Sequence, residues 1–183
     1  IHIWEDDWTY KQDIVKSIIL KKLNLIEKEE NYKYFIKNVS VEDTIMFLSE
    51  NHLSIVDVDI SNNNIGLYVD NTLISIICLN SNNGLIFCDK IFTCYTDSTK
   101  ILFEHYLKTN SNLKMTSLSE YRMFKSDSIY SDLGFVKGEL KEPDYFWYKN
   151  INRYRHDDEN IDLDKHSKIY GCGLQEWIYL GAK

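Results

Sequence analysis

The sequence has no long apolar run, and its cysteines lack the spacing of a metal knuckle. The most apolar stretch, LISIICL at residues 73–79, is far shorter than the roughly 20 residues that a membrane-spanning helix needs. The cysteines, Cys78, Cys88, Cys94 and Cys172, form no CxxC motif, and three of them lie in or beside apolar segments. We therefore expect a soluble, intracellular protein with reduced thiols and no membrane partner.

Glycine and positive charge are also scarce. The chain has seven glycines, and its formal net charge is −7. A surface with this charge does not attract phosphate on every side, so any contact with nucleic acid must come from a local basic patch. Apolar residues make up 44% of the 183 residues and aromatic residues 14%, which is enough for one substantial core. One domain with an appendage is the expected organisation.

The first 30 residues are expected to form the appendage. IHIW at residues 1–4 predicts a strand, and Asp6 or Asp7 is expected to cap a helix that runs to about residue 25. The helix is predicted from apolar residues at three- and four-residue spacing: Ile14, Val15, Ile18, Ile19 and Leu23.

An acidic stretch, EKEEN, then indicates a linker, and the main domain is expected to begin near Tyr32. We thus predict two parts, residues 1–30 and residues 31–183. The chain begins at Ile1 rather than at a methionine, so a preceding or removed segment remains an open interpretation.

The main domain alternates between strand and helix patterns. The helix over 40–52 is expected to have Ser40 as its cap and to bury Val41, Ile45 and Leu48. NIGLYVDNTLISIICL predicts a hairpin that turns at Asp70-Asn71. Further strands are expected at 32–39, 84–88, 113–118 and 143–150, and further helices at 97–110 and 126–135, the last ending at Gly134.

The C-terminal part is expected to contain a charged loop and a final hairpin. The loop is NRYRHDDENIDLDKH at residues 152–166. In the tail, Gly171 and Gly173 are predicted to form a tight turn between KIY and EWIYL, with Trp177 anchoring the closing strand.

The N-terminal stretch IHIWEDDWTYKQDIVKSIILKKL resembles the final strand and helix of the Vsr-like nuclease domain in predicted homing endonucleases of large phages and giant viruses. The matching parts are the turn from Trp4 to Trp8 and the helix core from Ile14 to Ser17. In that family the metal-binding residues lie upstream of this strand, which implies that they are absent here. Three acidic residues, Glu5, Asp6 and Asp7, follow Trp4 and could suggest a metal site. Consecutive side chains point in different directions, however, so we expect no metal.

Residues 32–183 resemble the domain that follows the nuclease in the same viral proteins. The matching pieces are FLSENHL, GLYVDNTLISIICL, IFCDKI, SIYSDLGF, PDYFWYKNINRYRH and KIYGCGLQEWIY. The order of elements resembles the GNAT acyltransferase fold. The resemblance implies an α/β (α+β) fold with a GNAT-like mixed, mostly antiparallel sheet flanked by helices, preceded by the strand-helix appendage.

The resemblance to the GNAT fold does not imply that this chain has acyltransferase activity. GNAT enzymes hold the coenzyme A pyrophosphate on a glycine-rich turn at a helix N-terminus. The corresponding stretch here, CDKIFTCYTDSTKIL, has no glycine and places Asp89 and Asp97 where phosphate would lie. Tyr130 matches the tyrosine that often acts as the general acid in GNAT enzymes, and it is also an ordinary packing residue one turn before Gly134.

Two further residues are candidates for a cleft. His52, in ENHL, matches a histidine of the viral family and could titrate near neutral pH. The alternative is a histidine that is satisfied at the end of a helix. Tyr121 is the second cleft candidate. The five histidines are scattered, so no structural zinc is expected.

Basic residues interleaved with aromatic residues are the candidates for contact with nucleic acid. Arginine can pair with phosphate through two parallel donors, and aromatic rings can stack on bases. Asp157, Asp158 and Glu159 follow directly, and local ion pairs with them are the alternative. The candidates, from EYRMFK and FWYKNINRYRH, are Arg122, Lys125, Lys149, Arg153 and Arg155.

The leading hypothesis is a non-catalytic DNA-binding or positioning domain of a viral endonuclease-like protein, without a cofactor. It would act inside the host cell, in the cytoplasm or at the viral DNA, with association with the virion as a further location. The first alternative is an N-acyltransferase that uses acetyl coenzyme A, with Tyr130 as the acid. The second is a protein-interaction or structural module recruited into a larger viral assembly.

Overall fold

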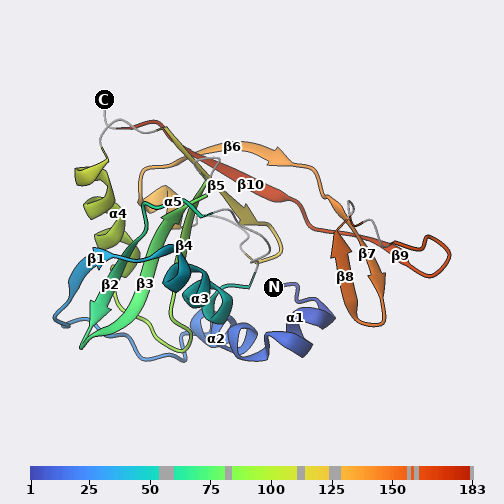
Figure 1. Ribbon diagram of the computed structural model, residues 1–183, viewed down its shortest axis with the longest axis horizontal. Helices are drawn as coiled ribbons and strands as arrows, with labels where there is room; N and C mark the ends of the chain where they lie inside the picture. Colours follow the sequence, from blue (N-terminus) through green and yellow to red (C-terminus); the bar gives the residue numbers. More distant parts are fainter. Residues whose placement is uncertain are drawn as a thin grey trace. The chain divides into compact units, whose positions relative to one another are not determined.

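A computed structural model of the chain describes residues 1–53, 60–80, 84–110, 114–123, 129–155, 158 and 161–181. These residues contain five helices and ten strands, which confirms the α+β class (Figure 1). The chain contacts define two compact units. The first consists of Ile1–Gln12 and Leu118–Ile178, and the second of Asp13–Ser117 and Tyr179–Lys183. The boundary predicted at residue 30 does not coincide with this division.

The second unit is built on one antiparallel sheet in the order β1-β2-β3-β4. The predicted hairpin is confirmed as β2 and β3, and it turns at Asp70 and Asn71, whose φ angles are 47° and 63°. Aspartate and asparagine tolerate this left-handed geometry, which matches the twist of the paired strands. The strands are β1 (Phe35–Asn38), β2 (Ile65–Val69), β3 (Thr72–Leu79) and β4 (Leu85–Asp89).

Two helices, α3 (Val41–Asn51) and α4 (Ser98–Thr109), pack on this sheet. Ser40 caps α3 as predicted, because its Oγ accepts a hydrogen bond of 3.0 Å from the Asp43 amide. The predicted buried face of α3 is wrong at Ile45, which is 48% exposed. The helix instead buries Thr44, Phe47 and Leu48, because the register of α3 turns these side chains to the sheet.

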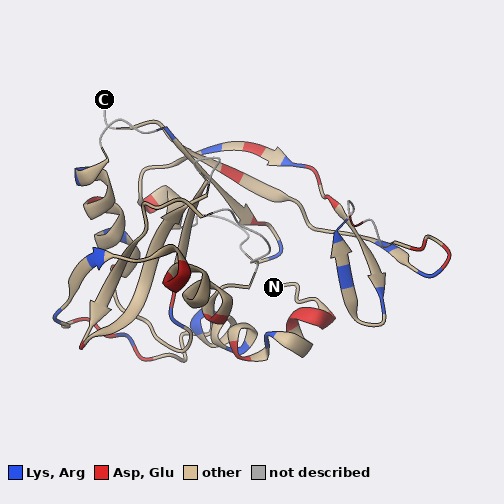
Figure 2. Ribbon diagram, in the orientation of Figure 1, with Lys and Arg blue, Asp and Glu red and all other residues tan. Residues whose placement is uncertain are grey.

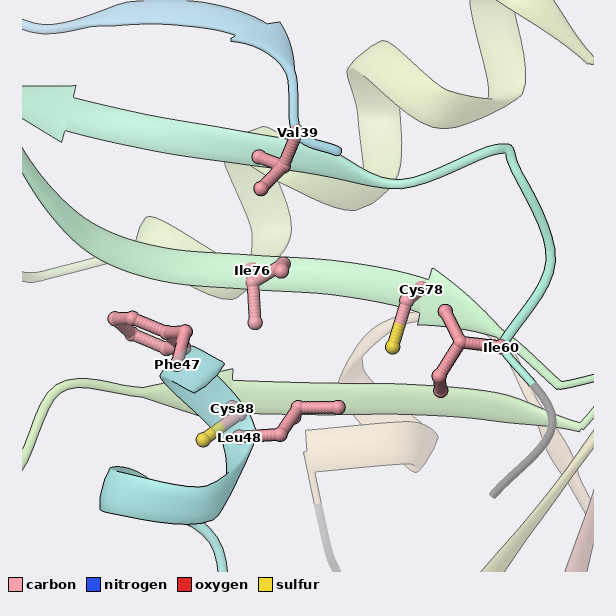
Figure 3. Close-up of a cluster of buried hydrophobic side chains, with 7 residues drawn as sticks. All are labelled: Val39, Phe47, Leu48, Ile60, Ile76, Cys78 and Cys88. Atoms are coloured by element: carbon pink, nitrogen blue, oxygen red, sulfur yellow. The ribbon is translucent and has the colours of Figure 1, made fainter. Parts of the chain in front are cut away.

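The strands β3 and β4 present different side chains to the two helices. On one face, Ile76 and Cys88 are cross-strand partners and form a buried cluster with Phe47 and Leu48 of α3 (Figure 3). On the other face, the Phe87 ring lies 6.0 Å from the Phe103 ring of α4. Each fully buried side chain of this kind contributes roughly 1.5–3 kcal/mol of burial free energy. The second unit is thus a three-layer core.

The first unit contains most of the remaining strands, in two three-stranded sheets. One has the order β5-β10-β6 and the other β8-β7-β9. A short helix, α5 (Ile129–Asp132), is followed by Gly134 with φ 84°, which confirms the predicted left-handed end. The strands are β5 (Met115–Glu120), β6 (Val136–Lys141), β7 (Tyr145–Lys149), β8 (Asn152–Arg155), β9 (Ser167–Tyr170) and β10 (Leu174–Tyr179).

The N-terminal elements differ from those predicted. Residues 1–4 form no strand with any described part of the chain. The expected single helix is divided at Lys11 into α1 (Glu5–Tyr10) and α2 (Gln12–Lys22). The N-cap residue of α1 is Trp4, so the predicted capping role of Asp6 and Asp7 is wrong. Both aspartates lie inside the first turn, where the helix dipole favours negative charge.

The predicted C-terminal hairpin is wrong. Ser167–Tyr170 pairs with β7, whereas Leu174–Tyr179 pairs with β6, so the two strands of the tail belong to different sheets. Gly173, with φ +83°, lies in the connection, where a Cβ atom would stand 2.7 Å from the Lys141 carbonyl oxygen. The anchoring role of Trp177 is confirmed, because it is 2% exposed and its Nε1 donates a 2.9 Å hydrogen bond to Ser119 Oγ.

Candidate nucleic-acid interface

A buried ionic cluster joins α1 to distant parts of the first unit. Asp7, which is 4% exposed, accepts a 2.7 Å hydrogen bond from Arg122 Nη1 through one carboxylate oxygen and a 2.6 Å bond from Arg153 Nη2 through the other. Arg153 Nε also donates to Asp6 Oδ2 at 2.7 Å. Arg122 Nε pairs with Glu120. Charge-assisted pairs of this kind are the strong hydrogen bonds of proteins.

The cluster is balanced in charge. Three carboxylates, from Asp6, Asp7 and Glu120, face two guanidinium groups and Lys11, the residue that ends α1. Burial lowers the pKa of Lys11, while Asp7 acts in the opposite direction. Burial opposes the charge on Arg122, but Glu120 and Asp7 outweigh it and raise the pKa of the guanidinium. The carboxylates and the guanidinium groups are thus paired inside the first unit.

One side of the sheet β8-β7-β9 contacts the ionic cluster and holds it in place. The Arg153 guanidinium carbon lies 5.1 Å from the Trp4 ring centre and 5.6 Å from that of Phe146, so the ring of the residue before α1 and a ring from β7 flank it. Tyr148 Oη donates a 2.6 Å hydrogen bond to Glu5 Oε2, which raises the pKa of the tyrosine. Figure 2 shows the acidic α1 and the basic β8 that these contacts join.

The opposite side of this sheet has a different composition. In β7 the side chains alternate, so Tyr145, Trp147 and Lys149 face away from the cluster, while Phe146 and Tyr148 face it. The register places Tyr145 opposite Tyr170, Trp147 opposite both Lys168 and Tyr154, and Lys149 opposite Asn152. We call this side the platform face. Its strand residues are Tyr145, Trp147, Lys149, Asn152, Tyr154, Lys168 and Tyr170, and none is acidic.

The aromatic rings of the platform face are close neighbours. The ring centres of Tyr145 and Trp147 lie 5.7 Å apart at an interplanar angle of 87°, and those of Tyr145 and Tyr170 lie 6.4 Å apart. Lys168 Nζ is 3.7 Å from the Tyr145 ring centre and 5.2 Å from that of Tyr170. Lys168 and Tyr170 are exposed, the latter at 60%, so solvent reaches this side of the sheet.

Acidic side chains lie beside the platform face rather than on it. Asp162 pairs with Lys165 at 2.7 Å, and this contact is the main reason that the pKa of Asp162 is lowered. Lys149 and His166 lower this pKa further, so Asp162 is within electrostatic reach of Lys149. The His166 ring also stands edge-on to Tyr154, at 5.3 Å.

The turn between β7 and β8 holds an unfavourable residue. Asn150 and Ile151 have φ angles of 49° and 66°. Asparagine adopts this region readily, but a β-branched side chain there is a genuine outlier. The tight turn keeps Lys149 directly opposite Asn152, and it does so at the cost of local strain.

The predicted contact residues lie in different environments. Arg122 and Arg153 are held in the ionic cluster, with side chains only 6% and 17% exposed. Lys149 lies on the platform face, whereas Arg155 is exposed and belongs to the opposite side, across from Phe146. Lys125 lies outside the described residues.

The two residues predicted to line a cleft lie in different units. His52 ends α3, where its backbone amide donates a 2.8 Å hydrogen bond to the Leu48 carbonyl, and it belongs to the second unit. Tyr121 is 43% exposed in the first unit, where its amide donates to the Gly173 carbonyl. A pocket of about 320 Å³ in the second unit contains neither residue.

Tyr130, the acid of the alternative acyltransferase, is packed between other rings. Its ring stacks on Trp177 with centres 5.6 Å apart, and it stands edge-on to Phe135 at 5.4 Å. Within the described ranges, no group of three or more His, Cys, Asp or Glu side chains is placed to hold a metal ion. None of the described helices has the length and apolar character needed to cross a membrane.

Several residues of the platform face were missed from the sequence. Lys168, Tyr145 and Tyr170 were not among the candidates, because Lys168 and Tyr170 are separated from β7 by a loop. The alternation of Tyr, Trp and Lys at every second position of β7 was the one signal available. Asp6 and Asp7 were likewise missed as the partners of two predicted arginines.

The comparison with known proteins gives no relative: no protein-family model and no curated protein matches the chain.

Proposed function

We propose that this protein binds nucleic acid and positions it, without catalysing a reaction, and that the platform face is the contact surface. The single observation that carries the proposal is the separation of charge across the sheet β8-β7-β9. One side holds Arg153 in a charge-balanced cluster with Asp6 and Asp7, and the other presents lysines among aromatic rings with no acidic strand residue.

A local basic surface allows an acidic chain to bind phosphate. With a net charge of −7, attraction to phosphate has to be local, and it falls off within the Debye length of about 8 Å at physiological salt. Lys149 and Lys168 lie on one small surface, so their fields add over the same stretch of ligand. Arg122 and Arg153 are given a supporting role instead, because releasing either guanidinium would deprive the buried Asp7 carboxylate of one of its two partners.

The kinship inferred from the sequence fits this role and belongs to the same proposal. In a Vsr-like viral endonuclease with a degenerate GNAT-like domain, an accessory surface would hold DNA for a nuclease portion. Acetyl coenzyme A as the ligand, with Tyr130 as the acid, is the weaker candidate. Millimolar coenzyme A in a calorimeter tests that candidate directly, and a heat of binding would favour it.

The test of the proposal is a binding titration with labelled DNA, both single-stranded and duplex, at salt concentrations from about 50 to 200 mM. Binding should weaken as salt rises. The double variant Lys149→Glu and Lys168→Glu should bind about tenfold or more weakly at the lower salt concentration and show a shallower salt dependence.

The matched control is the double variant Lys33→Glu and Lys100→Glu. Both lysines are exposed and lie in the second unit, and the substitutions change the net charge by the same amount. The control should bind like the unmodified protein. Equal losses in the two double variants would reduce the effect to net charge, and the absence of binding to any nucleic acid would refute the proposal.

A further inference from the structure

The platform face presents more ring surface than a site for phosphate alone requires. Tyr145, Trp147 and Tyr170 form a contiguous group across two strands, with Lys168 between them. Building on the proposed function, we infer that the ligand is a single-stranded nucleic acid whose bases stack on these three rings. Lys149 and Lys168 then hold the phosphates.

The shape of the surface favours an unpaired strand over a duplex. A ring can stack on a base only if that base is not already stacked within a double helix, and sequence-tolerant single-strand proteins use aromatic side chains in this way. Reading a duplex requires an element that enters a groove, usually a helix or a two-stranded ribbon. The platform rings instead stand on the face of a three-stranded sheet.

The ring geometry allows more than one base to bind. Tyr145 and Trp147 are nearly perpendicular, at 87°, so their faces lie in different planes and each would take a base of its own. Tyr170 lies across the strands from Tyr145 and adds a third surface. Successive nucleotides would therefore cross from β7 to β9 rather than run along one strand.

Lys168 must move for this binding to occur. Its Nζ lies 3.7 Å from the Tyr145 ring centre, over the ring face that a base would occupy. An exposed cation-π contact is weaker than the stacking of a base on a protein ring, so a base displaces the ammonium group. The displaced Lys168 has a flexible stem and three donors, which suit it to a neighbouring phosphate.

The ionic cluster makes the platform rigid. Arg153 and Tyr148 lie on the side of the sheet opposite the rings and are tied to Asp6, Asp7 and Glu5 of α1. A surface fixed before binding loses less conformational freedom when the ligand arrives. The rings are therefore held in place by contacts that do not themselves touch the nucleic acid.

The experiment measures anisotropy of labelled strands of about 16 nucleotides. The probes are oligo(dT), oligo(rU), a duplex of the same length, and a strand of the same length with abasic sites. The two single strands should bind about tenfold or more tightly than the duplex or the abasic strand, which keeps the phosphates but has lost the bases. A preference between oligo(dT) and oligo(rU) identifies DNA or RNA as the natural ligand.

Substitutions at Tyr170 separate stacking from charge. Tyr170 is 60% exposed, so Tyr170→Ala should leave the fold intact, which circular dichroism checks. This variant should bind oligo(dT) about five- to tenfold more weakly, whereas Tyr170→Phe should bind like the unmodified protein because the ring remains. Neither variant should change binding to the abasic strand.

Different results would refute single-strand stacking and nucleic-acid binding as a whole. Equal affinity for oligo(dT), the duplex and the abasic strand, with Tyr170→Ala unchanged, would overturn single-strand stacking and leave nucleic-acid binding in place. Failure to bind all four probes would overturn both.

Discussion

The two sides of the sheet β8-β7-β9 use similar residue types for opposite purposes. On the side that faces α1, Arg153 and aromatic residues meet the carboxylates of α1, so the charge of Arg153 is balanced within the protein, while Arg155 on the same side is exposed. On the platform face, lysine and aromatic residues meet no acidic strand residue, and Lys168 and Tyr170 are open to solvent. Basic residues beside aromatic residues therefore do not define a binding surface until their carboxylate partners are known.

The largest expected difference between the two sides is in stability. Asp7→Ala should lower the free energy of unfolding by about 3–5 kcal/mol, because it leaves Arg122 and Arg153 without their shared buried partner. Urea-induced unfolding measures the change. Asp6→Ala, which removes one ion pair and the hydrogen bond that Asp6 accepts from the Asp7 amide, at a more exposed side chain, should cost less.

The matched variant on the platform face is Lys168→Ala, which should change stability by no more than about 0.5 kcal/mol because the side chain is exposed. If Asp7→Ala cost as little as Lys168→Ala, the ionic cluster would not support the sheet.

The second prediction concerns the strained turn that connects the central strand β7 to the edge strand β8. Ile151→Gly should raise the free energy of unfolding by about 1 kcal/mol, because glycine adopts φ near 66° without steric cost and Asn-Gly suits this hairpin turn. Thermal unfolding measures the gain.

The control for that prediction is Ile151→Ala, which keeps a Cβ atom in the left-handed region and removes only the branched end. It should recover less stability than Ile151→Gly. A loss of stability in the glycine variant would show that the Ile151 side chain contributes more by packing than its backbone costs.

The smallest effect is expected at the edge of the platform face. Asp162→Asn removes a negative charge that acts on Lys149 and pairs with Lys165, so affinity for oligo(dT) should rise about twofold. The gain should disappear at high salt. Asp132→Asn, a change of the same charge on α5, should leave the affinity unchanged, and an equal gain there would contradict a local effect.

The sequence was sufficient to predict an element where neighbouring residues give the same local signal. The hairpin β2-β3 combines apolar strands with Asp70-Asn71, whose left-handed tolerance selects the turn. The start of α3 follows from Ser40, because a serine cap bonds to an amide three residues away. Both features depend on residues that are close together in the chain.

The candidate site could not be predicted because its contacts are remote. NRYR was expected to be part of a charged loop, yet it forms β8, with Arg153 paired to aspartates 147 and 146 residues away. In β7, both sides carry aromatic residues, so hydropathy does not distinguish them. Only the packing of α1 on one side decides which rings remain open, and no local pattern encodes that choice.

The most direct test of the account is to map where a single strand touches the protein. Oligo(dT) carrying 5-iododeoxyuridine is cross-linked by ultraviolet light, and the modified residues are identified by mass spectrometry. We expect adducts on Tyr145, Trp147 and Tyr170. Adducts on Trp4, Phe146 and Tyr148, or confined to the second unit, with none on the platform rings, would contradict binding at the platform face.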